Sequence, residues 1–174
     1  MDDLKKYIRS VPDFPKKGIN FYDITTLLEN PIGFNLALGA MEKFITPKNP
    51  TKLVCIESRG FIFGAALSSR MNIGFVPVRK PGKLPYKTIS EEYDLEYGSD
   101  KVEMHADVLD SDDRVVIVDD LLATGGTMQA TCKLVEKLNS QIVGISTVID
   151  LNFLPWREKL SKYDVNYLIS YDSE

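Results

Sequence analysis

The stretch Val115-Val116-Ile117-Val118-Asp119-Asp120-Leu121-Leu122-Ala123-Thr124-Gly125-Gly126-Thr127 decides how this chain folds. Its first four residues are β-branched and too apolar to alternate between core and solvent. This predicts a strand that is buried on both faces, as in a parallel sheet covered by helices. Asp119 and Asp120 stand where that strand should end. Because ligands in open α/β sheets bind beyond the carboxyl ends of the strands, the sequence places two carboxylates at an expected binding site.

The residues that follow the acid pair are small and hydroxylated. Gly125 and Gly126 permit backbone angles that a side chain would hinder, so consecutive N–H groups can converge. A helix is expected from about Gly126, since apolar positions recur on one face over residues 128–138. Its N-terminus would offer free N–H groups to an anion, and the hydroxyls of Thr124 and Thr127 add donors. A phosphate site beside two carboxylates predicts a ligand with a phosphate and vicinal hydroxyls, such as a phosphorylated ribose.

Two other interpretations of the acid pair compete. The acidic strand of P-loop NTPases also ends in carboxylates, but the sequence G-x-x-x-x-G-K-[ST] does not occur in this chain. An Asp pair can also merely cap a turn. The Thr-Gly-Gly-Thr sequence that follows argues against that interpretation.

Length and composition indicate one domain. A chain of 174 residues can bury a proper core but is too short for two ordinary domains, so we expect a single domain over residues 1–174. Apolar residues make up 44% and charged residues 26% of the chain, as in soluble globular proteins. No apolar run approaches the roughly 20 residues that span a bilayer.

The termini, the cysteines and the charge narrow the class further. Residues 1–6 lack the apolar core of a signal peptide, which predicts a cytoplasmic protein. Cys55 and Cys132 show no metal-binding spacing and are expected to be buried, reduced thiols. A net charge of −4 argues against nucleic acid as the main partner, so local basic clusters require a local anion. We expect neither a membrane nor nucleic acid as partner.

The rest of the chain alternates strands with helices. Asn30 and Pro31 form a good helix start, with an N-cap and a proline in the first turn. This order of elements predicts an α/β fold with a central parallel sheet of about five strands flanked by helices. The further strands are expected at 52–56, 74–78, 142–149 and 165–171, and the further helices at 2–9 and 60–71.

Two of these strands deliver polar residues to the same edge as the acid pair. Glu57, Ser58 and Arg59 follow strand 52–56 and precede a helix, where N–H donors, a hydroxyl and a fixed positive charge suit a pyrophosphate. A plain surface arginine is the alternative. A basic loop over 79–85 follows strand 74–78, and its glycine and two prolines favour a mobile loop. A solvated charge run is the alternative there.

A β-hairpin is expected from residues 91–97 and 101–106 around Gly98-Ser99-Asp100. Together with the basic loop it would form a lid that excludes water from the reaction. His105 is the single histidine, which excludes histidine-based metal sites, and we expect it at the strand surface. Trp156 is expected to pack in the core.

At this point the chain resembles the type I phosphoribosyltransferases, whose phosphoribosyl-pyrophosphate motif is similar to residues 115–127. The flanking blocks resemble the adenine-specific members of that family. They are Pro12-Asp13-Phe14-Pro15, Phe21 with Asp23-Ile24, Glu57-Ser58-Arg59-Gly60-Phe61, Arg79-Lys80 with Gly82-Lys83-Leu84-Pro85, Leu95-Glu96-Tyr97-Gly98 and Arg157-Glu158-Lys159-Leu160.

The resemblance implies a role for each matching residue. The ribose hydroxyls would be bound by Asp119 and Asp120, and the 5-phosphate by Ala123, Thr124, Gly125, Gly126 and Thr127. Pyrophosphate would be served by Arg59, Arg79, Lys80 and Lys83, with Glu57 and Ser58 also in the substrate site. Mg²⁺ would be carried by the pyrophosphate near the acid pair, with no direct protein ligand.

The same resemblance assigns the base side. Phe21 and Leu151 would sandwich adenine, while backbone groups around Asn20 and Tyr22 would read its edge. From the residues alone, core packing competes with base stacking for the adjacent aromatics Phe21 and Tyr22. Glu96 would accept the proton of adenine as the catalytic base, together with catalytic roles for Arg59 and Arg79, and Tyr97 would lie in the substrate site.

The implied reaction joins adenine to 5-phosphoribosyl 1-pyrophosphate (PRPP), giving AMP and pyrophosphate in purine salvage. The family also implies a small hood, built from about 1–30 and 150–174, and a homodimer. Two alternatives stay open: a transferase for another base such as xanthine, hypoxanthine or orotate, and a regulator that senses PRPP without catalysis. Tyr22 stands where family members commonly carry Arg or Lys, which leaves a related base such as a diaminopurine open.

Overall fold

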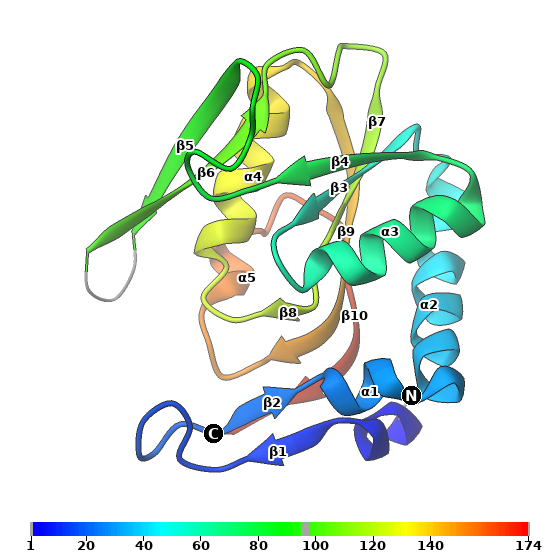
Figure 1. Cartoon of the computed structure of the whole chain (residues 1–174), viewed down its shortest axis with the longest axis vertical. Coiled ribbons are helices and arrows are strands. Elements are labelled where there is room, and N and C mark those ends of the chain that lie inside the picture. The colour runs from blue at the N-terminus through cyan, green and yellow to red at the C-terminus, as the bar shows by residue number, and fades with distance from the viewer. Residues whose placement is uncertain (1, 95–97, 174) are drawn as a thin grey trace.

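A central parallel sheet organises the chain, and a computed structural model describes it over residues 2–94 and 98–173 (Figure 1). The sheet runs in the order β10-β9-β7-β3-β4, and every pairing in it is parallel. The short strand β8 pairs with β9 beside this path. The strands are β3 (Lys52–Ile56), β4 (Gly74–Val78), β7 (Arg114–Val118), β8 (Leu121–Leu122), β9 (Gln141–Leu151) and β10 (Val165–Tyr171).

The predicted central strand is β7, and it is buried on both faces as expected. It lies between β3 and β9, with Ile117 opposite Val54 on one side and Ile145 on the other. Val116 and Val118 contribute to one core cluster, while Val115 and Ile117 contribute to the other. The sheet therefore separates two hydrophobic cores, which confirms the predicted α/β fold.

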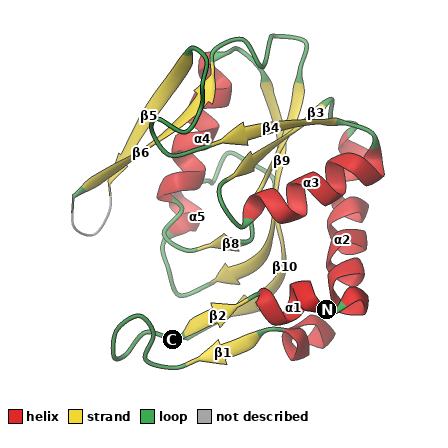
Figure 2. Ribbon diagram, viewed as in Figure 1, coloured by secondary structure: helices red, strands yellow, loops and turns green. Residues whose placement is uncertain are grey.

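Helices cover both faces of the sheet (Figure 2). On one face lie α2 (Pro31–Ile45) and α3 (Gly60–Met71), and on the other lies α4 (Gly126–Lys137). Asn30 caps α2 as predicted, because its Oδ1 accepts hydrogen bonds from the amides of Ile32 and Gly33 at 3.1 and 3.0 Å. The predicted helix starts at Gly60 and Gly126 are confirmed.

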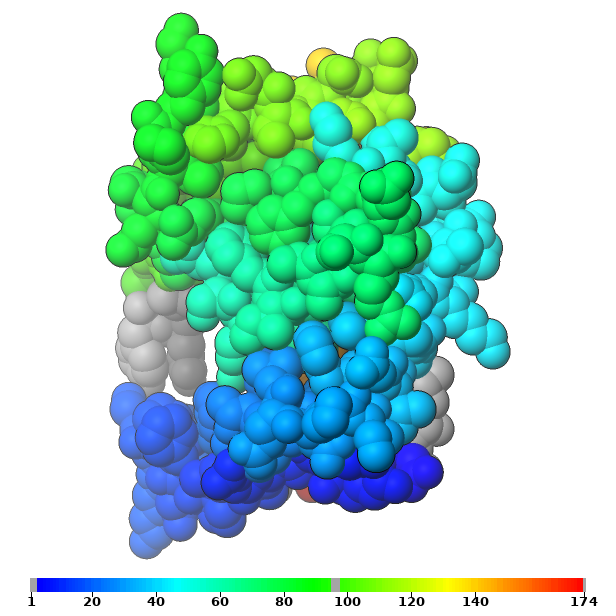
Figure 3. All heavy atoms as spheres, turned by 45° about the vertical axis from the view of Figure 1, so that its right-hand side comes forward, coloured from blue at the N-terminus to red at the C-terminus, as the bar shows by residue number. Residues whose placement is uncertain are grey.

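Smaller elements surround this framework. The hairpin of β5 (Thr88–Asp94) and β6 (Ser99–His105) lies beside α4, and the antiparallel pair β1 (Arg9–Val11) and β2 (Phe21–Asp23) lies at the lower end in Figure 1. In Figure 3 the N-terminal residues, in blue, form this lower end of the molecule. The remaining elements are α1 (Thr25–Glu29), α5 (Trp156–Lys159) and the 3-10 helices η1 (Asp2–Tyr7) and η2 (Thr46–Lys48).

Two sequence expectations need correction. Residues 2–9 do not form an α-helix: η1 ends at Tyr7, and Arg9 already pairs with Asp23 in the β1–β2 sheet, so strand pairing ends the helix early. His105 is not a surface residue of its strand, because it is half-buried and its Nε2 is buried without a hydrogen-bond partner among the described residues. The Tyr86 ring covers it, with 6.3 Å between ring centroids.

Other expectations about packing are confirmed. Cys55 and Cys132 are buried and free, and burial raises the pKa of the Cys132 thiol to about 12. Trp156 is buried, and its Nε1 donates a hydrogen bond to Asp150 Oδ1 at 2.6 Å. Within the described part of the chain, no helix is long and apolar enough to cross a membrane.

Candidate active site

A cavity of about 380 Å³ opens at the carboxyl ends of β3, β4 and β7. Its polar lining consists mainly of residues that the sequence placed at these strand ends. It joins the turn after β3, one lysine after β4, the acid pair after β7 and the loop that starts α4. These residues are Glu57, Ser58, Arg59, Lys80, Asp119, Asp120, Ala123, Thr124, Gly125, Gly126 and Thr127.

Asp120 of the acid pair is buried and forms an ion pair with Arg59, while Asp119 is half-buried. Arg59 Nε lies 2.8 Å from Asp120 Oδ2, and the Asp120 side chain is only 6% exposed. Burial raises the pKa of Asp119 well above its ordinary value, and the charge of Asp120 raises it further. Burial also raises the pKa of Asp120, while Arg59 opposes that rise. Arg59 is therefore the cation that favours the ionised form of the pair, together with backbone hydrogen bonds to the two carboxylates.

One acceptor of the pair has spare hydrogen-bonding capacity. Asp120 Oδ2 is buried and within ion-pair distance of Arg59, yet it accepts no hydrogen bond of good geometry from any described residue. A buried carboxylate oxygen in that state carries a desolvation cost that a hydroxyl donor would remove. The carboxylates of Asp119 and Asp120 line the cavity and offer acceptors to a ligand with hydroxyl groups.

Space beside the pair is set by a glycine. A Cβ at Gly60, the first residue of α3, would lie 2.7 Å from Asp119 Oδ1 and 3.0 Å from the Asp119 Cα. A side chain at residue 60 would therefore displace both the Asp119 carboxylate and its backbone. The start of α3 can lie this close to the end of β7 because residue 60 is a glycine.

The loop before α4 has the geometry expected of an anion site. Gly125 precedes the helix with φ of +75°, a left-handed conformation, and a Cβ there would lie 2.9 Å from the Trp156 Cβ. The free amides of the first turn of α4 face this loop, whose carbonyl at Thr124 accepts a hydrogen bond from Lys159 Nζ at 2.9 Å. Helix α5 therefore supports the loop from behind.

The three cations of the basic loop are placed differently. Lys80 lines the cavity, donates to the Tyr93 hydroxyl at 3.0 Å and forms an ion pair with Asp100. Arg79 forms an ion pair with Glu57 and donates to the Lys83 carbonyl at 3.2 Å, but it does not line the cavity. The Lys83 side chain is exposed. The structure thus brings only Lys80 of the three directly to the cavity wall.

The residues expected on the base side lie apart from the cavity lining. Phe21 is half-buried, and its ring centroid is 5.4 Å from the Arg59 guanidinium, so it stands next to the site. Tyr22 is buried and stacked on Tyr171 with 3.7 Å between ring centroids, which agrees with the packing interpretation for its side chain. Leu151 ends β9 opposite Tyr171 and is half-buried.

Of the three remaining expected residues, Asn20, Glu96 and Tyr97, the structure describes only Asn20. The Asn20 side chain accepts a hydrogen bond from the Ser10 hydroxyl at 2.7 Å. Glu96 and Tyr97 lie outside the described residues, so their expected roles are not addressed by the structure.

Several cavity residues were missed by the sequence analysis. Leu121 and Leu122 of β8, Met128 of α4, and Tyr93 and Val102 of the hairpin all line the cavity. The two leucines belong to the motif itself and could have been included. The alternation of Val102 and Met104 indicates the inner face of the hairpin, but no sequence signal says which surface that face meets.

Metal binding by the chain alone finds no support in the described residues. Over residues 2–94 and 98–173 no group of three or more His, Cys, Asp and Glu side chains could hold a metal ion. Mg²⁺ is commonly bound through one or two carboxylates together with substrate phosphates and water. The carboxylates of Asp119 and Asp120, which line the cavity, fit a metal delivered with such a substrate.

Comparison with known proteins identifies the class of this fold and site. Residues 23–169 match the model of the phosphoribosyl transferase domain, and the chain belongs to that family. Adenine phosphoribosyltransferase from Solidesulfovibrio magneticus is 55% identical over 161 residues, which cover 92% of this chain and 94% of that protein. The chain therefore belongs among the adenine phosphoribosyltransferases of the family.

Solved structures agree with this placement. The adenine phosphoribosyltransferase of Thermoanaerobacter pseudethanolicus superposes with a TM-score of 0.94 at 49% identity, covering 98% of this chain and 99% of that one. The enzyme of Saccharomyces cerevisiae, complexed with adenine and an imino-altritol bisphosphate, gives a TM-score of 0.91 at 37% identity, with 97% of each chain covered. The predicted fold and the predicted family are both confirmed.

Proposed function

We infer that this chain catalyses the transfer of a phosphoribosyl group from PRPP to adenine, with release of AMP and pyrophosphate. It is then a glycosyltransferase of purine salvage, EC 2.4.2.7. The observation that carries the inference is one cavity in which the acid pair Asp119 and Asp120 adjoins a glycine-rich helix start. Full-length similarity to adenine phosphoribosyltransferases supports it.

Each part of PRPP has a proposed partner in the cavity. Asp119 and Asp120 accept hydrogen bonds from the ribose hydroxyls, and the place of both residues in the cavity lining supports this assignment. The 5-phosphate binds at residues 123–127, where the first amides of α4 and the positive end of the helix dipole favour an anion. Arg59 and Lys80 contact the pyrophosphate, with Arg79 and Lys83 farther from the cavity wall.

The reaction moves charge between groups that these residues can stabilise. As the glycosidic bond breaks, positive charge grows on the ribose and negative charge on the departing pyrophosphate. The acid pair stabilises the first and Arg59 with Lys80 the second. Mg²⁺, bound to pyrophosphate near Asp119 and Asp120, would neutralise phosphate charge. Holding both reactants in place lowers the barrier by as much as roughly 7–11 kcal/mol.

The base side is proposed from the resemblance. Phe21 and Leu151 sandwich adenine and the backbone around Asn20 and Tyr22 reads its edge. The position of the Phe21 ring beside Arg59 supports the first part. Glu96 accepts the proton that leaves adenine, and Tyr97 belongs to the substrate site.

The hood, the cellular location and the oligomeric state are proposed together with the activity. The N-terminal elements over 1–30 and the segment 150–174 form a hood over the base within a single domain, and the stacking of Tyr22 on Tyr171 supports this. The protein acts in the cytoplasm and as a homodimer.

The deciding experiment is pyrophosphate release from PRPP and Mg²⁺, measured with adenine, diaminopurine, hypoxanthine, xanthine or orotate. We expect release with adenine only, or with adenine far above the rest. Strong turnover with another base would replace adenine as the substrate. Binding of PRPP without turnover on any base would support the non-catalytic regulator instead.

Substitution of Glu96 tests the proposed base. We expect E96Q to lower kcat by roughly 100- to 10,000-fold, the usual contribution of a general base, with an unchanged melting temperature. Wild-type turnover by this variant would refute the role of Glu96 and leave the overall reaction standing.

A further inference from the structure

Lys80 reaches the cavity while bound to two residues of the hairpin. Its Nζ donates to the Tyr93 hydroxyl at 3.0 Å and forms an ion pair with Asp100. The Tyr93 hydroxyl donates in turn to Asp100 Oδ2 at 3.1 Å, while Asp100 Oδ1 accepts from the Lys101 amide at 2.7 Å. Each member of this triad therefore has a defined partner. Asp100 was expected in the hairpin turn, but it lies in β6 and pairs with Tyr93 of β5. Neither residue was expected in the site.

The hairpin register places Tyr93 and Asp100 on its inner face. The two residues lie directly opposite each other, and the next residues on the same face of β6 are Val102 and Met104, both buried. On this face the Glu91 carboxylate, opposite Val102, is paired with Lys133 and Lys137 of α4, whereas the Asp100 carboxylate is paired with Lys80. The Lys80 ammonium holds the pKa of Asp100 below its usual range, so this carboxylate stays ionised at neutral pH.

Tyr93 also fixes the triad relative to the phosphate loop. A Cβ at Gly126, the first residue of α4, would lie 3.2 Å from Tyr93 Cδ2. The tyrosine ring therefore packs closely on the loop while its hydroxyl holds Lys80. Through this single side chain, the positions of Lys80 and of the helix start are linked.

We propose that Asp100, together with Tyr93, is a positioning residue that holds Lys80 at a fixed separation from the phosphate loop, so that both anionic ends of PRPP are recognised together. The proposal rests on the proposed function, because it assigns Lys80 to pyrophosphate. A lysine ammonium has three donor hydrogens. Tyr93 and Asp100 take two, which leaves one for a pyrophosphate oxygen and removes rotamer freedom that binding would otherwise have to restrict.

The test uses D100N in the full-length protein, with PRPP and adenine varied separately. We expect the KM for PRPP to rise about tenfold, the effect of weakening one charge-assisted hydrogen bond, while kcat and the KM for adenine stay within about twofold. The matched control is E92Q. Glu92 is an exposed residue of the same hairpin whose carboxylate pairs with Lys101 at 3.0 Å, and its loss should change neither KM.

A double-mutant cycle separates positioning from a general structural effect. If Asp100 acts through Lys80, D100N adds no further rise in the KM for PRPP once K80M is present. Y93F, which keeps the ring and removes the hydroxyl, should shift the same parameter in the same direction. An unchanged or lowered KM for PRPP in both D100N and Y93F, or an additive cycle, overturns the proposal.

Calorimetric binding of PRPP without any base makes the outcome independent of the reaction. Weaker binding by D100N than by wild type and E92Q supports the proposal even if the wild type turns over no base, a result that would refute only the proposed activity. Equal PRPP affinity in the three proteins refutes the positioning role, whatever the activity of the wild type.

Discussion

Three charges set the state of the site at the scale of single residues. Asp119 and Asp120 are neighbours in the sequence, and burial disfavours the charged form of each. Arg59 is the cation that opposes this effect, from 2.8 Å. Besides its proposed contact with pyrophosphate, Arg59 therefore favours the ionised form of the pair, the form in which both carboxylates accept hydrogen bonds from ribose hydroxyls.

Replacing Arg59 by methionine tests this second role. In R59M the pKa values of the pair should rise, because the opposite charge that lowers them is gone. The acid limb of the kcat/KM profile for PRPP should then move to higher pH, and the plateau should fall about 100- to 1,000-fold with the loss of one transition-state donor. An acid limb at the wild-type pH would contradict the role of Arg59 in ionising the pair.

Arg70 provides the matched control for that experiment. It lies in α3, the helix that Arg59 directly precedes, but it pairs with Glu42 of α2 at 2.7 Å and not with the acid pair. R70M should leave both the plateau and the acid limb unchanged, since surface ion pairs contribute little and this one does not face the cavity.

Part of the site could be predicted residue by residue from the sequence. Arg59, Asp119 and Asp120 each come within a few residues of a buried strand, and parallel strand ends meet at one edge, so their proximity followed from topology. Tyr93 and Asp100 could not be found this way. Their contact with Lys80 joins a loop to a hairpin, and no spacing along the chain encodes which surface a hairpin packs against.

At the scale of elements, α5 and the phosphate loop form one unit. Trp156 leaves no room for a side chain at Gly125, Lys159 holds the Thr124 carbonyl, and Asp150 at the end of β9 holds both Trp156 and Arg157. The loop conformation is therefore supported by contacts with a helix that follows it by some thirty residues.

Substitution of Gly125 by alanine tests the dependence of phosphate binding on this contact. An alanine at φ of +75° costs about 1–2 kcal/mol by itself, and its Cβ would also press on Trp156. We expect the KM for PRPP to rise well over tenfold with a smaller change for adenine, as measured by steady-state kinetics.

A substitution at Gly18 serves as a control, because it introduces the backbone strain of G125A without the contact between the new Cβ and a neighbouring side chain. Its φ is +91° and a Cβ there would meet nothing within 4 Å, so G18A carries backbone strain without a clash. It should lower the melting temperature and leave the KM for PRPP as in wild type. An equal KM for PRPP in G125A and wild type would show that loop and α5 are not coupled as described.

The elements themselves differ in how far sequence could predict them. The strands of the main sheet are short apolar runs between turn signals, and the long helices carry caps and an apolar face, so each is encoded locally. The segment at residues 2–9 has a helical pattern too, but the pairing of Arg9 with Asp23 in the β1–β2 sheet replaces the helix at its C-terminal end. Local patterns cannot predict an outcome that a distant strand decides.

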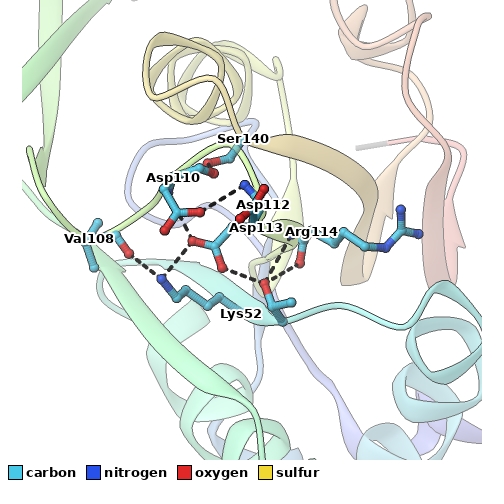
Figure 4. A network of polar contacts seen from close by, with 8 residues as sticks. Lys52, Val108, Asp110, Asp112, Asp113, Arg114 and Ser140 are labelled. Atoms are coloured by element: carbon cyan, nitrogen blue, oxygen red, sulfur yellow. Dashed lines mark hydrogen bonds and ion pairs between the residues drawn. The ribbon is translucent and has the colours of Figure 1, made fainter.

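At the scale of the whole molecule, the two chain termini lie close together. The two ends of the parallel strands carry different polar groups. Tyr22 near the N-terminus stacks on Tyr171 near the C-terminus, and the Tyr22 hydroxyl donates to the Ser173 carbonyl at 3.3 Å. The cavity lies at the carboxyl ends of the strands. A separate polar network centred on Asp113 lies at their amino ends, at the start of β3 and β7 (Figure 4).

Asp113 and Asp110 together join three parts of the chain at that end of the sheet. It accepts hydrogen bonds from the Thr51 hydroxyl at 2.7 Å, from Lys52 Nζ at 2.8 Å and from the Asp110 amide at 3.1 Å. The Ser140 hydroxyl, just before β9, donates to the Asp110 carbonyl at 2.5 Å. Burial alone would raise the pKa of Asp113, but these hydrogen bonds and the Lys52 charge outweigh burial and lower it.

This lowered pKa predicts how stability depends on pH. A carboxyl whose pKa is lower in the folded than in the unfolded state contributes stability above its unfolded value of about 3.9, and that contribution is lost as the pH falls through the folded-state pKa. D113N should therefore reduce the free energy of unfolding by about 1–3 kcal/mol at pH 7, and the difference from wild type should shrink below about pH 5. Urea unfolding at several pH values measures this difference in the free energy of unfolding.

The exposed neighbour Asp112 gives the control, since D112N should change stability by less than about 0.5 kcal/mol at any pH. Because the network lies at the edge opposite the cavity, D113N should keep the wild-type kcat at 25 °C. A destabilisation that persists unchanged at low pH would mean that Asp113 acts through packing and not through its charge.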